Sequence, residues 1–226
     1  MSTIFVTGTD TGVGKTRISC GLLRQLRAAG FSACGYKPIA SGCERTPEGL
    51  RNEDALALQD AAQTTEDYGC INPYAFEPAI APHLAAKAVG VNPNIVLLNQ
   101  AHAELAHGYE WVVTEGAGGF LVPLNDDITF GDWATQQQWP VLLVVGMRLG
   151  CINHALLSAE AIARRGKLVG WVANTLSPDM PQLRENIDTL KACMPAPLLG
   201  VVDYGGEVKL DLDVIKQGVT GSPGFP

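Results

Sequence analysis

The stretch GTDTGVGKT at residues 8–16 has the residue types of a phosphate-binding loop. Five residues separate Gly8 from Gly14, one more than the spacing G-x-x-x-x-G-K-[ST] allows. Backbone N–H groups at a helix start favour phosphate, the Lys15 ammonium reaches outer phosphates, and the Thr16 hydroxyl suits Mg²⁺. We therefore predict phosphate binding and interpret the extra residue as the mark of a subfamily. The alternative is a glycine-rich turn with an incidental Lys-Thr pair.

Glu115 ends the apolar run at 111–114 and precedes the sequence Gly-Ala-Gly-Gly at 116–119. A carboxylate at the carboxyl end of a buried strand, beside a phosphate loop, is well placed to reach Mg²⁺ directly or through water. The alternative is a loop or helix-capping carboxylate. Together with the loop, Glu115 is predicted to bind the metal.

Lys37 closes a second apolar run, 33–36, and is followed by Pro38 and then by Ser41. A lysine at the carboxyl edge of a parallel sheet points into the crevice where ligands bind. Taken alone, such a lysine is more often a solvated strand end. The four histidines lack the spacing of metal ligands and are assigned no catalytic role.

These side chains need a parallel sheet to position them. Short apolar runs alternate with segments of helical periodicity, which is typical of strands buried on both faces of an α/β fold. The predicted strands are 3–7, 33–37, 111–115, 141–146, 168–174 and 197–202. The predicted helices are 15–29, 53–62, 95–107, 152–165 and 181–193.

Two segments break this alternation. Residues 64–93 contain four prolines and are predicted to cross over the sheet, anchored by Tyr74, Phe76 and Leu84. The tail from Gly205 onward is polar, glycine-rich and weakly patterned. With no internal repeat, the chain is predicted to form one domain, 1–226.

Composition excludes several partners. The formal charge of −7 comes without a cluster of Lys or Arg, so we expect no nucleic acid. The longest apolar run, VLLVV, is far too short to span a membrane, and no secretory signal is present, so the expected location is the cytoplasm. The six cysteines form no C-x-x-C pair and are interpreted as reduced thiols.

Seven motifs together resemble the dethiobiotin synthetase family of the P-loop superfamily. They are GTDTGVGKT at 8–16, GYKPIASG at 35–42, GLRNEDALAL at 49–58, NPY at 72–74, VTEGAGG at 113–119, LVVGMRLGCINHALL at 143–157 and GWVAN at 170–174. The resemblance covers about the first 200 residues, and no single motif would suffice. It implies a P-loop NTPase-like fold with a mostly parallel central sheet and helices on both faces.

The resemblance also implies a reaction. Members of this family are homodimeric ligases that use ATP, Mg²⁺ and CO₂ to close the ureido ring of dethiobiotin from 7,8-diaminopelargonic acid, releasing ADP and phosphate. The intermediates are an N-carbamate and a carbamic-phosphoric anhydride. Cations must offset the repulsion between the carbamate and the triphosphate, a task that suits Lys15, Lys37 and Mg²⁺.

The family positions that match this chain imply its site residues. Lys15 and Lys37 are catalytic, and the metal ligands are Thr16, Asp54 and Glu115. On residues alone, Asp54 is equally a first-turn helix acid. The nucleotide-binding residues are Gly12, Val13, Gly14, Lys15, Thr16, Arg17, Asp54, Glu115, Gly116, Ala117, Gly118, Asn174 and Thr175. The substrate-binding residues are Thr11, Lys37, Ser41, Gly150, Cys151, Ile152 and Asn153.

Gly150–Asn153 begins a helix whose free N–H groups are expected to bind the substrate carboxylate. By resemblance, this group comes from the neighbouring subunit. Thr175 departs from the family, which usually has an acidic residue there.

The alternative functions are a related P-loop amidoligase or a partitioning-type ATPase that acts as a switch. Partitioning ATPases usually carry an additional lysine near the start of the loop, and Thr9, Asp10 and Thr11 supply none. Lys37-Pro38 with Ser41 favours the ligase.

Overall fold

The computed structural model describes residues 1–220, and its centre is a six-stranded sheet with the strand order β10-β9-β8-β1-β7-β2. Every neighbouring pair in this sheet is parallel. The strands are β1 (Ser2–Gly8), β2 (Ala33–Tyr36), β7 (Trp111–Gly119), β8 (Val141–Met147), β9 (Leu168–Thr175) and β10 (Leu198–Val202). They lie at the six positions predicted from the apolar runs, which confirms the α/β class.

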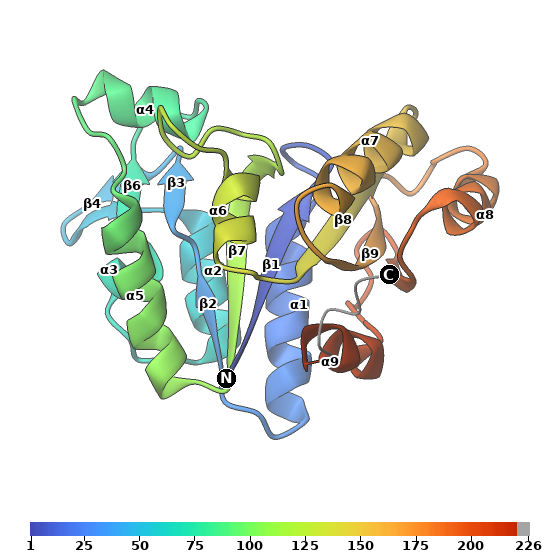
Figure 1. Ribbon diagram of the computed structural model, residues 1–226, viewed down its shortest axis with the longest axis horizontal. Helices are drawn as coiled ribbons and strands as arrows, with labels where there is room; N and C mark the ends of the chain where they lie inside the picture. The colour runs from blue at the N-terminus through green and yellow to red at the C-terminus, as the bar shows by residue number, and fades with distance from the viewer. Residues whose placement is uncertain (221–226) are drawn as a thin grey trace.

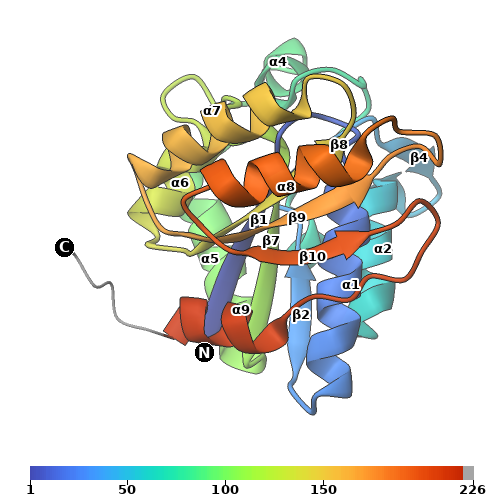
Figure 2. The same ribbon diagram turned by 90° about the vertical axis from the view of Figure 1, so that its right-hand side faces the viewer.

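Helices cover both faces of this sheet because each strand buries side chains on both sides. In β1, Ile4 and Val6 pack into one core while Phe5 packs into the other. The face of Ile4 is covered by α1 (Lys15–Ala28), α2 (Glu53–Ala62) and α9 (Leu212–Thr220). The face of Phe5 is covered by α5 (Ile95–Gly108), α6 (Phe130–Gln136), α7 (Cys151–Ala163) and α8 (Leu183–Cys193). Figures 1 and 2 show the two layers.

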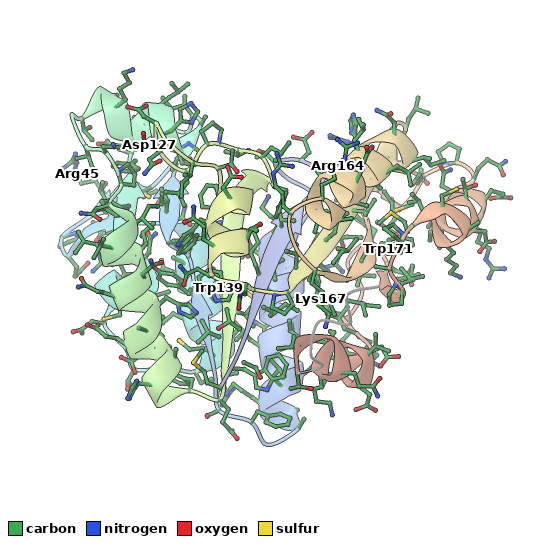
Figure 3. The ribbon with its side chains drawn as sticks, viewed as in Figure 1. Arg45, Asp127, Trp139, Arg164, Lys167 and Trp171 are labelled. Atoms are coloured by element: carbon green, nitrogen blue, oxygen red, sulfur yellow. The ribbon has the colours of Figure 1, made fainter. Side chains whose placement is uncertain are left out.

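Aromatic side chains fill the core on the face of Phe5. Trp139 and Trp171, both labelled in Figure 3, belong to this cluster. The rings of Trp139 and Trp133 meet edge-on with centroids 4.8 Å apart. The His102 ring lies 4.4 Å from the Trp139 ring, and its Nε2 lies 3.0 Å from the Thr3 hydroxyl. His102 is therefore packed within the core.

The segment 64–93 folds beyond the β2 edge, on the left side of Figure 1. Its elements are α3 (Tyr68–Ile71), β6 (Tyr74–Phe76) and α4 (Pro82–Ala88). β6 pairs in parallel with β3 (Ile39–Ser41), and β4 (Glu44–Thr46) forms a hairpin with β5 (Gly49–Arg51).

The anchor predicted at Leu84 is wrong, because its side chain is 47% exposed while Ala85 and Ala86 of the same helix are buried. The bulky residue faces solvent, and the two small residues let α4 pack closely.

The tail contains a helix that the sequence analysis did not predict. In α9, Leu212, Ile215 and Val219 recur at helical spacing and pack on the core on the face of Ile4, where Ile215 is completely buried. The prediction for residues 221–226 lies outside the described residues. Within 1–220, no helix combines the length and apolar character that a membrane span requires.

Candidate nucleotide and substrate site

The phosphate loop joins the end of β1 to the start of α1. Its backbone is left-handed at Gly12, with φ of 73°, and at Gly14, with φ of 89°. A Cβ on Gly14 would overlap the side-chain nitrogen of Asn174, which also donates a 2.8 Å hydrogen bond to the Val13 carbonyl. Both the conformation and the close approach therefore require glycine at residue 14. Asn174, at the end of β9, therefore contacts the loop at both Val13 and Gly14.

Lys15 follows this loop and is buried. Its Nζ donates to the Asp10 carbonyl over 3.1 Å, so the ammonium curls back along the loop. Burial, and then the nearby positive charge of Lys37, lower the pKa of Lys15 to about 8. The loop thus carries a cation whose solvation is incomplete, as expected for a group awaiting an anionic ligand.

Four elements, α1, α2, β2 and β7, bring a lysine, two carboxylates and a hydroxyl together. Lys37 follows β2, and its Nζ donates to Glu115 Oε1 over 2.7 Å and to Asp54 Oδ2 over 2.9 Å. The Thr16 hydroxyl lies 2.6 Å from Asp54 Oδ1 and 2.9 Å from Glu115 Oε1. The three predicted metal ligands, Thr16, Asp54 and Glu115, therefore lie close together. The Lys37 ammonium contacts both carboxylates.

Glu115 lies deeper than the sequence predicted. β7 continues to Gly119, so Glu115 pairs with Val6 inside the sheet instead of ending the strand. Gly116, the next residue of the strand, lies against the Phe5 ring, where a Cβ would come within 2.8 Å of a ring carbon. The Glu115 side chain is 0% exposed, and its Oε2 has no hydrogen-bond partner within residues 1–220.

The charges in this cluster support one another. Burial disfavours the Lys37 ammonium, but Glu115 and Asp54 outweigh this effect and raise the pKa of Lys37. Burial likewise disfavours the Asp54 carboxylate, but Lys37 and the Thr16 hydroxyl outweigh it and lower the pKa of Asp54. Lys37 is therefore charged at neutral pH and neutralises part of the acidic pair.

An open cavity of about 680 Å³ lies over the loop and this cluster. Ten residues predicted from the sequence line it, namely Thr11, Gly12, Gly14, Lys15, Thr16, Lys37, Ser41, Asp54, Ala117 and Gly118. Sequence reasoning missed the others, which are Ala40, Asn52, Glu53, Ala79, Ile80, Ala81, Pro82 and Val122. Ala79–Pro82 and Val122 form an apolar wall beside the charged floor. The segment 64–93 thus supplies part of the site.

Asn52 is a residue that a sequence signal could have found. It caps the start of α2, where its side-chain oxygen accepts from the N–H groups of Asp54, over 3.1 Å, and Ala55, over 3.3 Å. An Asn directly before a helix with acids in its first turn is a standard start signal. The cap fixes the helix start and hence the position of Asp54. The apolar wall carries no comparable signal, because it forms only when 79–82 folds back.

The remaining predicted residues lie outside this cavity. Val13, Glu115, Gly116, Asn174 and Thr175 are buried beneath or beside the loop. Arg17 faces a second cavity, lined by α1, Ala57 of α2 and residues 206–208. None of Gly150–Asn153 is among the residues that line the first cavity. The structure of one subunit therefore does not bring the predicted carboxylate group to Lys37.

The start of α7 is more restricted than predicted. Gly150 has a left-handed φ of 92°, and the first backbone bond of the helix runs from the His154 N–H to the Gly150 carbonyl. Contrary to the prediction, the Cys151 N–H is not free, because it donates to the Arg148 carbonyl over 2.9 Å. The turn at Met147–Gly150 folds back and uses this donor. The N–H groups of Ile152 and Asn153 precede the first backbone hydrogen bond of the helix, so the helix itself gives them no acceptor.

A parallel sheet whose first strand leads through a glycine loop into Lys15 and Thr16 defines a P-loop NTPase fold. Solved structures support this class at the level of fold alone. A ParA family ATPase from Chlorobium tepidum matches with a TM-score of 0.55 at 10% identity, covering 96% of this chain and 98% of that one. The MinD cell division protein from Aquifex aeolicus matches with a TM-score of 0.53 at 15% identity, covering 97% and 88%.

Sequence comparisons identify the family. A family model described as "AAA domain" matches residues 2–209. The ATP-dependent dethiobiotin synthetase BioD 1 of Escherichia coli O157:H7 is 51% identical, covering 87% of this chain and 88% of that protein. The ATP-dependent dethiobiotin synthetase BioD of Pseudomonas paraeruginosa is 53% identical, covering 89% and 90%. This chain belongs to the dethiobiotin synthetase family, a family of ATP-dependent ligases.

Proposed function

We propose that this protein closes the ureido ring of dethiobiotin from 7,8-diaminopelargonic acid, CO₂ and ATP. The observation that carries the proposal is the position of Lys37, between the phosphate loop and a cavity with an apolar wall. Such a cavity suits a substrate with two amines at one end of an aliphatic chain. The names of the family members point to the same product.

The proposed chemistry has three steps. One substrate amine attacks CO₂ and loses a proton, giving an N-carbamate. A carbamate oxygen then attacks the γ-phosphorus of ATP, and the bond to the β-phosphate oxygen breaks to release ADP. The second amine attacks the carbonyl of the resulting carbamic-phosphoric anhydride, which closes the ring and releases phosphate.

Lys37 and Lys15 meet the charge requirement of the second step. An anionic carbamate must approach an anionic phosphate, so fixed cations lower the barrier while the loop holds the phosphate in line. Lys15 binds the outer phosphates, and Lys37 contacts both the carbamate and the γ-phosphate. Thr11 and Ser41 line the same cavity and position the diamine end.

The residues around Thr16 fit Mg²⁺. A hydroxyl and two carboxylates are the oxygen ligands this ion takes, and the unpartnered Oε2 of Glu115 is an acceptor in need of a partner. Bound there, Mg²⁺ would neutralise charge on the outer phosphates of ATP. Within residues 1–220, no group of three or more His, Cys, Asp or Glu side chains could hold a metal ion. We therefore propose that phosphate oxygens complete the site.

We assign the remaining nucleotide contacts to Gly12, Val13, Gly14, Arg17, Gly116, Ala117, Gly118, Asn174 and Thr175. The whole chain acts as one ligase domain. The cytoplasm suits it, since all six cysteines are free thiols and ATP is the co-substrate.

A homodimer would complete the site. The N–H groups at the start of α7 do not line the cavity of their own subunit, which supports a carboxylate receptor supplied by a second copy. Leu149, directly before this helix, is 100% exposed, and Leu157 within it is 57% exposed. Exposed apolar side chains before α7 and at its middle are a suitable contact for a partner.

Product formation tests the proposal against the ATPase-switch alternative. We expect ADP release in a coupled assay to require both the diamine and bicarbonate, with one ADP formed per ring closed. A diamine analogue that lacks one of the two amines serves as the control, because it cannot close the ring. ATP turnover that ignores the diamine would favour the switch and contradict the ligase.

A further inference from the structure

A chain of hydrogen bonds links the backbone of Lys37 to the start of α2. It begins at Asn72, whose side-chain nitrogen donates to the Lys37 carbonyl over 2.7 Å. The Tyr68 hydroxyl donates to the Asn72 side-chain oxygen over 2.9 Å and accepts from the Asn52 N–H over 2.8 Å. Neither Tyr68 nor Asn72 is among the residues that line the cavity above Lys37. The chain therefore joins two parts of the site from outside the cavity.

One end of the chain fixes the backbone at Lys37. Strand β2 ends at Tyr36, so the sheet no longer holds the next residue. Instead, the Lys37 N–H donates to the Ile71 carbonyl over 2.8 Å, and the Lys37 carbonyl accepts from Asn72. Asn72 is 3% exposed, and its side-chain nitrogen also donates to the Tyr74 carbonyl over 3.1 Å. The turn at 71–74 thus holds the point from which the Lys37 side chain extends.

The other end of the chain fixes the start of the helix that carries Asp54. The Asn52 N–H donates to the Tyr68 hydroxyl, while the Asn52 side-chain oxygen accepts from the Asp54 N–H over 3.1 Å. The Arg51 guanidinium lies 4.3 Å from the centre of the Tyr68 ring, a cation–π contact that keeps the ring in place. A single hydroxyl therefore connects the cap of α2 to the turn that holds Lys37.

We propose that Tyr68 and Asn72 are positioning residues that hold the Lys37 ammonium in place relative to Asp54 for phosphoryl transfer, an inference that rests on the proposed function. Lysine carries its charge on a flexible four-carbon stem, so the position of the charge depends on where the backbone is held. A misplacement of about 1 Å at a reacting centre costs up to about a hundredfold in rate. Opening the chain should therefore slow the chemical step.

Tyr68→Phe tests this role, because it removes the hydroxyl and keeps the ring beside Arg51. We expect kcat for diamine-dependent ADP release to fall about tenfold. The Kd of ADP with Mg²⁺, measured by calorimetry, should stay within about threefold of native, because ADP lacks the γ-phosphate that Lys37 is proposed to contact. Tyr109→Phe is the matched control, since the Tyr109 hydroxyl contacts Thr64 and Glu66 instead. Its kcat should stay native.

Asn72→Ala opens the same chain at the next link and should also lower kcat without weakening ADP binding. If both residues act through one chain, the double variant is no slower than the slower single variant, whereas independent effects multiply. Urea unfolding identifies which variants fold, and Tyr68→Phe alone decides if Asn72→Ala does not.

Two results would overturn the inference. They are a native kcat in folded Tyr68→Phe, and losses that multiply in the double variant. A parallel loss of ADP affinity and kcat in Tyr68→Phe would also overturn it, because that pattern marks general damage to the site. A native protein whose ATP turnover ignores the diamine would be a different failure, since it contradicts the proposed function and removes the reaction that Tyr68 and Asn72 are inferred to serve.

Discussion

At the scale of single residues, Lys37 holds together two carboxylates that would otherwise repel each other. The nearly buried ammonium contacts both Glu115 and Asp54, and Glu115 has no exposed surface. A buried carboxylate that loses its cation keeps the full cost of its desolvation. Lys37 therefore offsets the negative charge of this cluster, so the residue that we propose as catalytic also contributes to folding stability.

This arrangement predicts that metal can replace the ammonium. Lys37→Met should lose about 3 kcal/mol of folding stability in a chelating buffer, because two carboxylates are left unpaired. Mg²⁺ or Mn²⁺ should restore much of this loss without nucleotide, whereas the native protein should gain little. Thermal and urea unfolding measure the effect. Lys15→Met is the control, since Lys15 contacts a carbonyl, and equal metal responses in both variants would refute the idea.

His102 gives the protein a pH dependence that lies away from the site. Burial lowers the pKa of His102 to about 4, below the usual 6.5, so the folded protein binds this proton less readily than the unfolded chain. Its contribution to stability is fully present above pH 6.5 and is lost as the pH falls toward 4. The difference amounts to about 3 kcal/mol.

The corresponding prediction is that His102→Gln flattens the stability profile between about pH 6.5 and 4. Glutamine can keep the hydrogen bond to Thr3 but binds no proton. Urea unfolding across this range would show the smaller slope. His107→Gln on the exposed side of the same helix should leave the native slope unchanged. Parallel profiles for the native protein and His102→Gln would remove His102 as the cause.

At the scale of elements, the sequence predicts what depends on local pattern. The six strands of the sheet and α1, α2, α5, α7 and α8 follow from apolar runs and helical spacing. Lys37 and Glu115 lie together because β2 and β7 are parallel neighbours, with Tyr36 opposite Thr114. The apolar wall at Ala79–Pro82 and the hydrogen bond that joins Arg17 of α1 to the end of β9 could not be predicted, because each joins segments far apart in sequence without a local signal.

The helix α9 contributes to folding stability, although the sequence analysis did not predict it. Ile215 is completely buried between this helix and the sheet, so Ile215→Ala should cost about 3 kcal/mol through lost burial and the cavity it leaves. Urea unfolding measures the loss. Gln217→Ala, at an exposed position of the same helix, should have little effect. A loss below about 1 kcal/mol for Ile215→Ala, the contribution of roughly one buried methylene group, would mean that α9 contributes little to the core.

At the scale of the whole molecule, the proposed substrate would need two binding regions that lie apart on one subunit. Its diamine end would meet ATP near Lys37, and the carboxylate at the other end of its chain would need a separate anion receptor. The free N–H groups of Ile152 and Asn153 are suitable donors, but they do not line the cavity that holds Lys37. The proposed dimer joins Lys37 of one chain to the α7 start of the other.

Subunit mixing tests this arrangement. Asn153→Trp should block the carboxylate receptor by bulk, since the donor there is the backbone, and Lys37→Ala should remove the catalytic cation. If the two inactive proteins are unfolded and refolded together, random pairing makes about half of the dimers mixed, and one of the two sites in each mixed dimer is intact. About a quarter of the native activity should therefore return. Mass spectrometry confirms the mixed dimers, and a mixture no more active than the average of its two parents would show that each site is built from a single chain.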